Sequence, residues 1–364
     1  METPHRAQET PDRRADTMSF TVRVRQFDAP FTVATGETIL DAALARELPY
    51  PHGCRSGNCG ACKSELVSGE VEMSPYSEFA LSEEEKSAGL VLACRAVPWS
   101  DCEVRFFEPD EVVAHPLRHM HARVVAHDDA THDIKRLRVE IVDGGPFSFT
   151  AGQYASLEFS GLPPRDYSMA NRPDEPLLEF HIRLIPGGAV TPYVSQRLCA
   201  GEMLKVSGPY GTSYLREKHT GPIIALAGGS GLAPIKSIVE AALAQGMRQP
   251  IALYFGVRDE RDLYFEEHFA ALAKRHGNLT FIPVLSEPSE STRRRTGYLA
   301  DAILRDFAAK GTLALDGAKA YLAGPPVMVE TAMAALAVLG VRKNDCHADA
   351  FYTEADKAQR VAKY

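Results

Sequence analysis

Apolar positions follow three different patterns along this chain of 364 residues. In the first, residues 19–33 alternate apolar and polar side chains around an Asp-Ala-Pro turn, which predicts a β-hairpin. A helical period begins after Thr38, and a short helix is predicted after Ser82, where Glu85 completes a capping box. Further strands are expected near residues 65–67, across 91–97 and at 102–108. Residues 18–108 therefore predict one small domain of strands and short helices.

The second pattern is strict alternation in several neighbouring segments, separated by turn residues. It is present in residues 121–129, 134–142 and 154–160, and it predicts a small antiparallel β-barrel over residues 120–216. Residues 109–119 have two prolines and no apolar period, so they are expected to form a linker.

The third pattern predicts a doubly wound α/β domain over residues 217–352. An apolar strand, a Gly-rich turn and an amphipathic helix follow one another in residues 221–246, and residues 251–257 supply another buried strand. Strand and helix segments continue to residue 336. Nucleotides bind at the carboxyl ends of the strands in such sheets, so the loops after these strands are candidate binding sites.

Composition and charge narrow the class of protein. The chain is 45% hydrophobic but has no run of 18 apolar residues, so no membrane span is expected. A formal net charge of −8 does not indicate a protein that binds nucleic acid. Residues 1–17 are polar without a signal-peptide core and are expected to be a disordered tail. Residues 353–364 are expected to be a charged C-terminal tail. Seven cysteines, an odd number, favour a reducing cytoplasm over a disulfide framework.

Four cysteines have the spacing of metal ligands. They form a C-x4-C-x2-C motif followed by a distant fourth cysteine: Cys54, Cys59, Cys62 and Cys94. This is the spacing of a plant-type [2Fe–2S] cluster, whose iron prefers soft thiolate ligands. Glycines within the loop allow backbone N–H groups to approach the sulfurs. A structural zinc site is the alternative, although the second Cys-x-x-Cys pair that such sites usually have is missing.

The barrel contains an R-x-Y-S string at Arg165, Tyr167 and Ser168. An arginine is suited to a pyrophosphate, a tyrosine to stacking on a flat ring, and a serine to hydrogen bonding a ring nitrogen. In the α/β domain, Gly228, Gly229, Ser230 and Gly231 form a Gly-rich turn between strand and helix, where backbone amides favour a diphosphate.

The choice between nicotinamide cofactors depends on the end of the next strand, at Gly256, Arg258 and Asp259. A carboxylate there accepts hydrogen bonds from ribose hydroxyls, whereas an arginine attracts the 2′-phosphate of NADPH. Because both types stand side by side, NADH is expected as the main cofactor, with NADPH tolerated.

These motifs together resemble the ferredoxin–NADP⁺ reductase superfamily. With a plant-type ferredoxin domain in front, the chain is similar to the NAD(P)H-dependent reductase components of bacterial ring-hydroxylating dioxygenases, from Met18 to Tyr352. The resemblance implies a β-grasp [2Fe–2S] domain, an antiparallel barrel that binds FAD rather than FMN, and an α/β domain that binds the nicotinamide nucleotide.

The resemblance also implies roles for individual residues. Tyr167, Ser168, Asp349 and Phe351 are expected at the flavin ring, where the last two close over it. Residues expected along the flavin nucleotide and its pyrophosphate are Arg165, His181, Ile182, Arg183, Gly188, Ala189, Val190 and Thr191. Gly324 and Pro325 match the motif on the nicotinamide side, in which this chain has Ala323 where the family often has cysteine.

The expected function is electron transfer from NAD(P)H through the flavin to the cluster, and then to a terminal oxygenase or its Rieske-type ferredoxin. Residues 18–108 have 8 Lys and Arg against 14 Asp and Glu, a net charge of −6, which is suited to transient docking of a basic acceptor. A solvated surface without a docking role is the alternative explanation of this charge. A diiron monooxygenase or a deoxysugar dehydratase is an alternative acceptor. A non-catalytic zinc or redox-sensing module is the alternative from another class.

Overall fold

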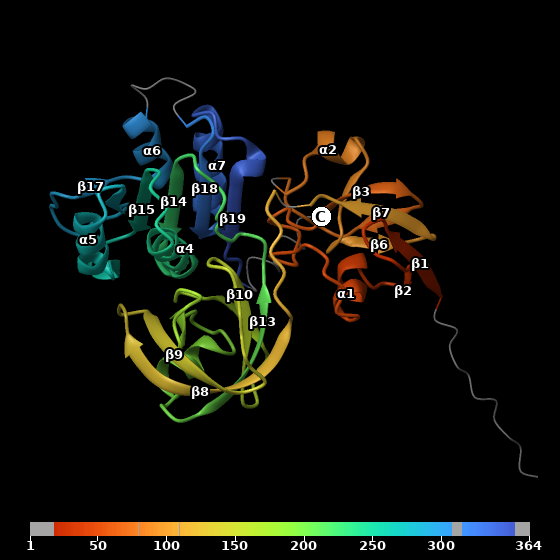
Figure 1. Cartoon of the computed structure of the whole chain (residues 1–364), viewed down its shortest axis with the longest axis horizontal. Helices are drawn as coiled ribbons and strands as arrows, with labels where there is room; N and C mark the ends of the chain where they lie inside the picture. Colours follow the sequence, from red (N-terminus) through yellow and green to blue (C-terminus); the bar gives the residue numbers. More distant parts are fainter. Residues whose placement is uncertain (1–17, 79, 109, 308–314, 354–364) are drawn as a thin grey trace, which may run out of the picture.

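The computed structural model describes residues 18–78, 80–108, 110–307 and 315–353. Within these ranges three domains follow one another along the chain (Figure 1), and the predicted fold class is confirmed. The disordered tail predicted for residues 1–17, and residues 354–364 of the predicted C-terminal tail, lie outside the described residues. None of the described helices is both long enough and apolar enough to cross a lipid bilayer.

The first domain is a small mixed sheet with two short helices. Its sheet has the order β2-β1-β7-β3-β5, and β4 and β6 form a separate ribbon. The elements are β1 (Ser19–Val24), β2 (Phe31–Ala34), α1 (Ile39–Leu44), β3 (Lys63–Ser68), β4 (Val71–Met73), α2 (Glu83–Ser87), β5 (Leu90–Leu92), β6 (Ala96–Pro98) and β7 (Cys102–Phe106). The Thr38 side chain caps α1, and the predicted capping box of Ser82 and Glu85 begins α2.

The prediction of a single strand across residues 91–97 is wrong. β5 ends at Leu92, a turn holds Cys94, and β6 begins at Ala96 in the other ribbon. The apolar run is continuous because residues on both sides of the turn are buried, so a pattern of burial alone does not reveal the turn. The turn brings the Cys94 thiol to the cysteine loop.

The second domain is a nearly closed antiparallel barrel. Its strands have the order β11-β10-β13-β8-β9-β12, and a bridge between Met169 and Phe180 joins the two ends of this sheet. The elements are β8 (Arg118–Asp129), β9 (Ile134–Asp143), β10 (Tyr154–Phe159), β11 (Arg165–Ser168), β12 (Leu178–Arg183), α3 (Thr191–Gln196) and β13 (Met203–Tyr210). Alternating apolar side chains of these strands fill the barrel interior.

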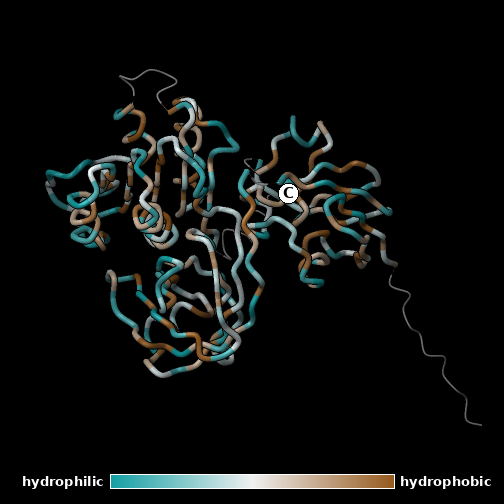
Figure 2. Tube along the Cα trace, in the orientation of Figure 1, coloured by the Kyte–Doolittle hydropathy of each residue, from teal (hydrophilic) through white to brown (hydrophobic). Residues whose placement is uncertain are grey.

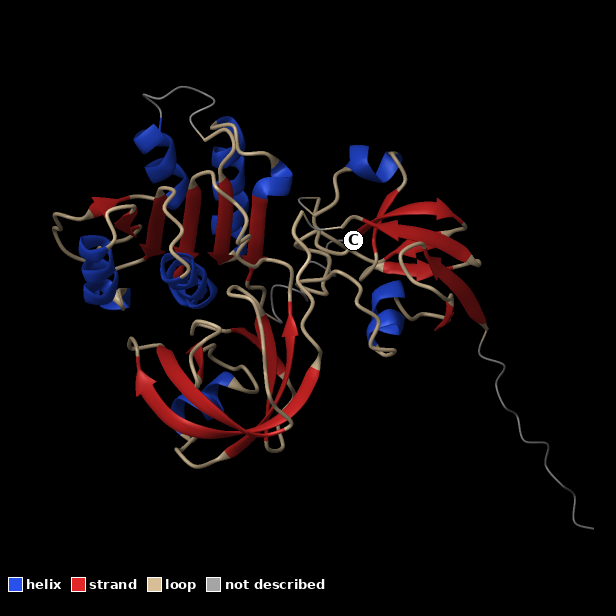
Figure 3. Cartoon of the chain, in the orientation of Figure 1, coloured by secondary structure: helices blue, strands red, loops and turns tan. Residues whose placement is uncertain are grey.

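The third domain is a parallel sheet of order β17-β16-β15-β14-β18-β19, covered on both faces. Its elements are β14 (Ile223–Gly228), η1 (Gly229–Gly231), α4 (Leu232–Ala244), β15 (Ile251–Val257), η2 (Glu260–Asp262), α5 (Glu266–Arg275), β16 (Leu279–Leu285), β17 (Arg295–Thr296), α6 (Leu299–Phe307), β18 (Lys319–Gly324), α7 (Pro326–Val338), η4 (Lys343–Asp345) and β19 (Cys346–Ala350). α4 and α5 cover one face, and α6 and α7 the other (Figure 3). Figure 2 shows that apolar segments gather inside the domains and polar ones at the outer loops.

The hydrophobic cores do not follow the domain boundaries. One core joins Ile134, Ala151 and Leu215 of the barrel side to the strands and helices of the α/β domain. The core of the first domain contains only residues from its own strands, helices and loops. The barrel and the α/β domain are therefore packed as one body, and the first domain is packed beside them.

Candidate functional site

The cysteine loop presents its thiols in two pairs. Cys54 and Cys59 interact with one another, and so do Cys62 and Cys94. In the part of the chain that the structure describes, no three of these sulfurs lie within 4.8 Å of one another. A tetrahedral zinc ion with bonds of about 2.3 Å brings all four sulfurs within about 3.8 Å of one another. Two pairs instead fit a two-iron cluster, in which each iron takes two thiolates.

Backbone N–H groups point at the sulfurs, as a cluster of anionic thiolates requires. The N–H groups of Ser56 and Asn58 donate to Cys54 Sγ at 3.5 and 3.2 Å, and Cys54 N–H donates to Cys59 Sγ at 3.3 Å. The Cys59 thiol and these backbone donors lower the pKa of Cys54 to about 5. A Cβ on Gly53 would lie 3.0 Å from Cys59 Sγ, so glycine leaves room for this close approach. The loop is therefore built to hold a [2Fe–2S] cluster.

The flavin-side residues of the barrel meet the last strand of the α/β domain. Ser168 Oγ donates to Asp349 Oδ2 at 3.1 Å, although 181 residues separate the two in the sequence. Burial raises the pKa of Asp349 to about 6, with smaller contributions from Cys54 and Asp166. The backbone N–H of Phe351 donates to Gly324 O at 2.9 Å, which fixes the segment after β19 beside the nicotinamide-side loop. The geometry brings together Ser168 and Asp349, which the sequence assigned to one place, and it holds Phe351 beside Gly324.

The other predicted flavin residues are dispersed around this point. Tyr167 lies beside Ser168 on β11, and burial raises the pKa of its hydroxyl. Arg165 is partly exposed and donates to its neighbour Pro164 O. Gly188, Ala189 and Val190 form the loop before α3, and the Thr191 hydroxyl turns back to accept from Ile185 N–H at 2.9 Å.

The strand β12 sends its three predicted residues in different directions. His181 is buried, and its ring contacts the Tyr264 hydroxyl at 3.1 Å and Glu179 Oε1 at 3.1 Å in the interface with the α/β domain. Burial lowers the pKa of His181 despite these partners. Ile182 lies in the barrel core. Arg183 donates to Asp133 Oδ2 at 2.9 Å at the edge of a cavity. The His181 and Ile182 side chains thus do not face an open site, and Arg183 does.

A cavity of about 520 Å³ lies at the carboxyl ends of β14, β15 and β16. Its lining includes most residues that the sequence assigned to the nicotinamide nucleotide: Gly228, Gly229, Gly256, Arg258 and Pro325. A Cβ on Gly228 would come within 2.9 Å of Pro325 Cδ, so glycine is needed where these two loops touch. Gly231 and Gly324 pack behind this lining, and Ser230 is the middle residue of η1. The position, the glycines and the size of the cavity fit a dinucleotide.

Asp259 is a neighbour of the cavity but not part of its lining. Its Oδ1 accepts from Glu260 N–H at 2.8 Å and from Ser289 N–H at 3.2 Å, so the carboxylate holds the turn η2 in place. Arg258, directly before it, lines the cavity with a half-exposed side chain. The Arg258 side chain therefore lies at the cavity, whereas the Asp259 carboxylate lies in the turn η2.

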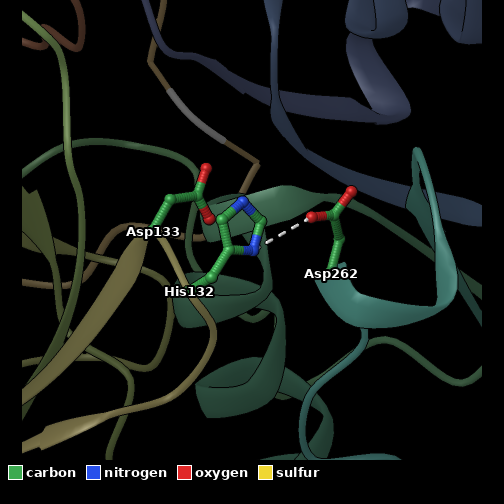
Figure 4. Close-up of side chains that lie close together, drawn as sticks. All are labelled: His132, Asp133 and Asp262. Atoms are coloured by element: carbon green, nitrogen blue, oxygen red, sulfur yellow. Dashed lines mark ion pairs between the residues drawn. The ribbon is translucent and has the colours of Figure 1, made fainter.

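Sequence reasoning missed several residues of the cavity. Figure 4 shows His132 between Asp133 and Asp262, with its Nδ1 3.5 Å from Asp262 Oδ1. These three side chains are close enough to share a cation, but Asp133 is already paired with Arg183. The pair of His132 with Asp262 connects the barrel to the α/β domain. No local pattern marks such a group, because its members are about 130 residues apart in sequence. Tyr298, exposed at the cavity edge, is a further missed residue with a face suited to an adenine ring.

The cysteine loop and the barrel are in direct contact. The Tyr154 hydroxyl on β10 donates to Gly53 O at 2.9 Å, and the His52 ring lies 5.9 Å from the Tyr210 ring. Tyr154 pairs with Ser168 across β10 and β11, so the same barrel edge contacts the cysteine loop and Asp349. The cysteine loop and the flavin-side residues therefore meet at this edge, and Asp349 connects it to β19 of the α/β domain.

Family models match each domain in turn. Residues 22–98 match the 2Fe-2S iron-sulfur cluster binding domain, residues 121–214 the oxidoreductase FAD-binding domain, and residues 225–334 the oxidoreductase NAD-binding domain. The cofactors expected from the sequence, a [2Fe–2S] cluster, FAD and a nicotinamide nucleotide, are thereby confirmed.

Curated relatives span nearly the whole chain. The reductase component of the naphthalene 1,2-dioxygenase/salicylate 5-hydroxylase systems of a Ralstonia species is 43% identical over 87% of this chain and 94% of its own length. The naphthalene 1,2-dioxygenase reductase component of Pseudomonas putida is 42% identical over 89% and 95%. The phenol 2-monooxygenase reductase component DmpP of a Pseudomonas strain is 35% identical over 94% and 97%.

Solved structures with the same domain order are also similar. The Amycolatopsis cytochrome P450 reductase GcoB matches with a TM-score of 0.74 and 36% identity, over 91% of this chain and 98% of its own. The ferredoxin reductase in carbazole 1,9a-dioxygenase matches with a TM-score of 0.67 and 29% identity, over 92% and 99%.

Proposed function

The chain belongs to the family of flavin and iron–sulfur reductase components of bacterial oxygenase systems, and we propose that its acceptor is a Rieske oxygenase or that oxygenase's ferredoxin, for hydroxylation of an aromatic ring. The chain is an NAD(P)H-dependent oxidoreductase that transfers electrons through FAD and a [2Fe–2S] cluster. The proposed acceptor is supported by the higher identity to the naphthalene dioxygenase components, 42–43%, than to the monooxygenase components, 34–35%.

One observation carries the proposed electron path. Ser168 of the barrel bonds Asp349 of the α/β domain at 3.1 Å, and Tyr154 of the same barrel edge bonds Gly53 of the cysteine loop at 2.9 Å. When bound, the flavin accepts two electrons as hydride and releases them singly, which matches a nicotinamide donor to a one-electron cluster. The converging residues give this exchange a single location.

We assign the residues at this location to positioning and proton holding. Asp349 is buried with a pKa raised to about 6, so its carboxylate accepts the Ser168 hydroxyl at neutral pH and takes up a proton just below it. Tyr167 and Phe351 are assigned to contacts with the flat flavin ring. Arg165 and the loop Gly188–Thr191 are assigned to the flavin phosphates.

An anaerobic titration tests the proposed function. The purified holoprotein is titrated with NADH and, separately, NADPH while flavin and cluster absorbance are followed. Bleaching of both chromophores by substoichiometric NADH is the expected result. Bleaching of the flavin alone would contradict the path to the cluster, and no bleaching at all would contradict the reductase function.

The second candidate acceptor is a diiron monooxygenase. The similarity to the phenol and propane 2-monooxygenase reductase components supports this alternative. Reconstitution separates the two: the reduced protein is mixed with a purified Rieske oxygenase system or with a diiron hydroxylase, and product formation per NADH consumed is compared. Coupled turnover with the diiron hydroxylase alone would overturn the proposed acceptor.

We infer that the acceptor docks on residues 76–78 and 80–86, which pack against the cysteine loop. Ser77 N–H donates to Gly57 O at 2.9 Å, and Glu78, Glu83 and Glu84 in this segment are exposed. Exposed carboxylates near a redox centre steer a basic partner into transient contact. Glu83→Lys/Glu84→Lys is expected to raise the KM for the acceptor several-fold at low salt, with ferricyanide reduction unchanged. Glu267→Lys/Glu290→Lys, at two exposed positions on the α/β domain, is the charge-matched control.

We also assign the adenosine end of the nicotinamide nucleotide to Arg258 rather than to Asp259, because only Arg258 lines the cavity. The carboxylate of Asp259 is used by backbone N–H groups of its own turn. Arg258→Ala is expected to lower kcat/KM for NADPH about tenfold or more, as for a lost charged hydrogen bond, with little change for NADH. Arg261→Ala, an exposed arginine outside the lining, is the control. A selective loss of NADH activity in Asp259→Asn would contradict this assignment.

A reducing, cytoplasmic compartment is part of the proposal. All seven cysteines are free thiols in the structure, and four of them are needed as cluster ligands. Mass spectrometry of alkylated protein from cells tests this point, with no disulfide expected.

A further inference from the structure

The peptide group between Gly53 and Cys54 is bonded on both sides. Its carbonyl accepts the Tyr154 hydroxyl at 2.9 Å, and its N–H donates to Cys59 Sγ at 3.3 Å. A hydroxyl of the barrel is thereby connected to a cluster ligand of another domain through one peptide.

The position of Tyr154 is fixed by its surroundings. The residue is 8% exposed, its ring packs 5.5 Å from that of Tyr210, and a Cβ on Gly211 would come within 2.9 Å of its Cδ1. Burial raises the pKa of the Tyr154 hydroxyl well above its usual value, so the proton remains on the oxygen and the group stays a donor. The hydroxyl therefore has one orientation toward Gly53.

Hydrogen bonds in a chain strengthen one another, since a carbonyl that accepts a bond makes its own peptide N–H a better donor. N–H bonds to sulfur stabilise the more negative, reduced form of an iron–sulfur cluster and raise its reduction potential. A donor at Gly53 O acts on Cys59 Sγ in this way without touching the sulfur.

We propose that Tyr154 is a positioning residue that couples the flavin barrel to the cluster: its hydroxyl sets the cysteine loop against the barrel and raises the reduction potential of the cluster through the Gly53–Cys54 peptide. This inference rests on the proposed function, because it assumes that the four cysteines hold the cluster. Tyr154 keeps its proton throughout, and no bond to it forms or breaks. Transfer inside the molecule is thus favoured only while the first domain is docked on the barrel.

The test compares Tyr154→Phe with Tyr210→Phe in the holoprotein. Tyr210 belongs to the same contact, but in the described part of the chain its hydroxyl makes no hydrogen bond to the cysteine loop, so its loss is a matched control. Cluster reduction is followed by electron paramagnetic resonance in a redox titration. In Tyr154→Phe, the ratio of reduced to oxidised cluster at a fixed potential is expected to fall about two- to tenfold, the range of a single hydrogen bond. Tyr210→Phe is expected to match the wild type.

A second variant strengthens the same bond instead of removing it. With 3-fluorotyrosine at position 154 the phenol is more acidic and donates more strongly, so the cluster potential is expected to move in the opposite direction. A wild-type titration curve for both Tyr154 variants would overturn the inference. Absence of the cluster signal from the wild-type protein itself would instead overturn the proposed function.

Discussion

The flavin barrel has two neighbours, and it is joined to them in different ways. Against the α/β domain it shares a hydrophobic core, and buried polar groups cross the boundary: Lys236 Nζ donates to Ala170 O at 3.0 Å, and Ser237 Oγ to Asn171 O at 2.6 Å. Against the first domain it has the Tyr154 bond to Gly53 and the ring contact of His52 with Tyr210. The first boundary is a continuation of the fold, and the second is a polar docking contact.

Linker residues supplement the weaker boundary. Asp110 forms ion pairs with Arg216 and Lys319, and the backbone carbonyl of Glu111 accepts the Tyr214 hydroxyl at 2.6 Å. Lys343 of the α/β domain adds an ion pair to Glu85 of the first domain. The hydride-transferring pair of domains thus needs one fixed geometry, while the cluster domain is held by contacts that water and salt can compete with. That difference suits a domain that must also meet an external acceptor.

The largest expected effect is the loss of Lys236 from the first boundary. Its ammonium is buried between Glu179 and Glu240, at 3.5 and 3.2 Å, so Lys236→Ala leaves two buried carboxylates without it. The free energy of unfolding is expected to fall by about 3–5 kcal/mol. Urea denaturation measures this, with Lys205→Ala, whose exposed pair with Glu158 is worth about 0–1 kcal/mol, as control. Equal losses in the two variants would break the comparison.

Buried His347 and partly buried Glu85 are expected to lose their contributions to stability in different pH ranges. Burial lowers the pKa of His347 to about 3, so the unfolded chain takes up a proton below about pH 6.5 that the folded chain refuses, and stability falls from there toward pH 3. Glu85 behaves differently: against the effect of partial burial, Lys63, Ser82 and Lys343 lower its pKa to about 2, so its contribution is present above about pH 4.5 and is lost only below it.

Urea denaturation between pH 7 and pH 5, above the range in which Glu85 titrates, measures this difference. The part of the protein that contains His347 is expected to lose about 1–3 kcal/mol over this range, and His347→Gln is expected to flatten the slope. Glu85→Gln is expected to leave the slope unchanged. A slope that Glu85→Gln removes and His347→Gln does not would contradict the two windows.

The linker has the next effect in size. Asp110→Asn removes the charge that faces the buried Arg216 and Lys319, but the Asp110 side chain is 44% exposed, so water replaces part of what is lost. A decrease of about 1–2 kcal/mol is expected, together with faster protease cleavage near residue 110. Asp174→Asn, in an exposed pair with Arg172, is the control. Unchanged cleavage would show that Asp110 does not hold the linker.

The sequence predicted what is local or periodic. The cysteine spacing, the capping box of Ser82 and the three patterns of apolar positions each depend on residues close in the chain, and they predicted the three domains and the [2Fe–2S] cluster, whereas FAD was implied by the resemblance. The turn at Cys94 was missed because a continuous apolar run is compatible with one strand or with two. Arg258 and Asp259 were both expected at the adenosine ribose, with opposite effects on cofactor choice, because their side-chain directions depend on the turn η2 and not on their order.

Contacts between domains were beyond the sequence for a different reason. Tyr154 and Gly53 are 101 residues apart, and His132 and Asp262 are 130 apart, with no pattern that connects either pair. In the sequence, Tyr154 fits the pattern of a buried position in a barrel strand. Its hydroxyl bond to Gly53 depends on the packing of the first domain against the barrel, which no sequence pattern shows. Asp349 and Ser168 were assigned to one place by resemblance alone, because their 3.1 Å contact joins two domains.

The smallest expected effect is that of Lys343→Ala. This variant tests how little the ion pair between the α/β domain and the first domain contributes to stability. The pair with Glu85 is 3.2 Å long, the Lys343 side chain is 53% exposed, and Glu85 keeps a second partner in Lys63. The free energy of unfolding is therefore expected to change by less than about 0.5 kcal/mol. Lys63→Ala, which removes the less exposed partner within the first domain, is expected to cost more, about 1 kcal/mol. If Lys343→Ala is the more damaging of the two, the first domain depends on its neighbour for stability, and the contrast between a continuous fold and a docked domain is wrong.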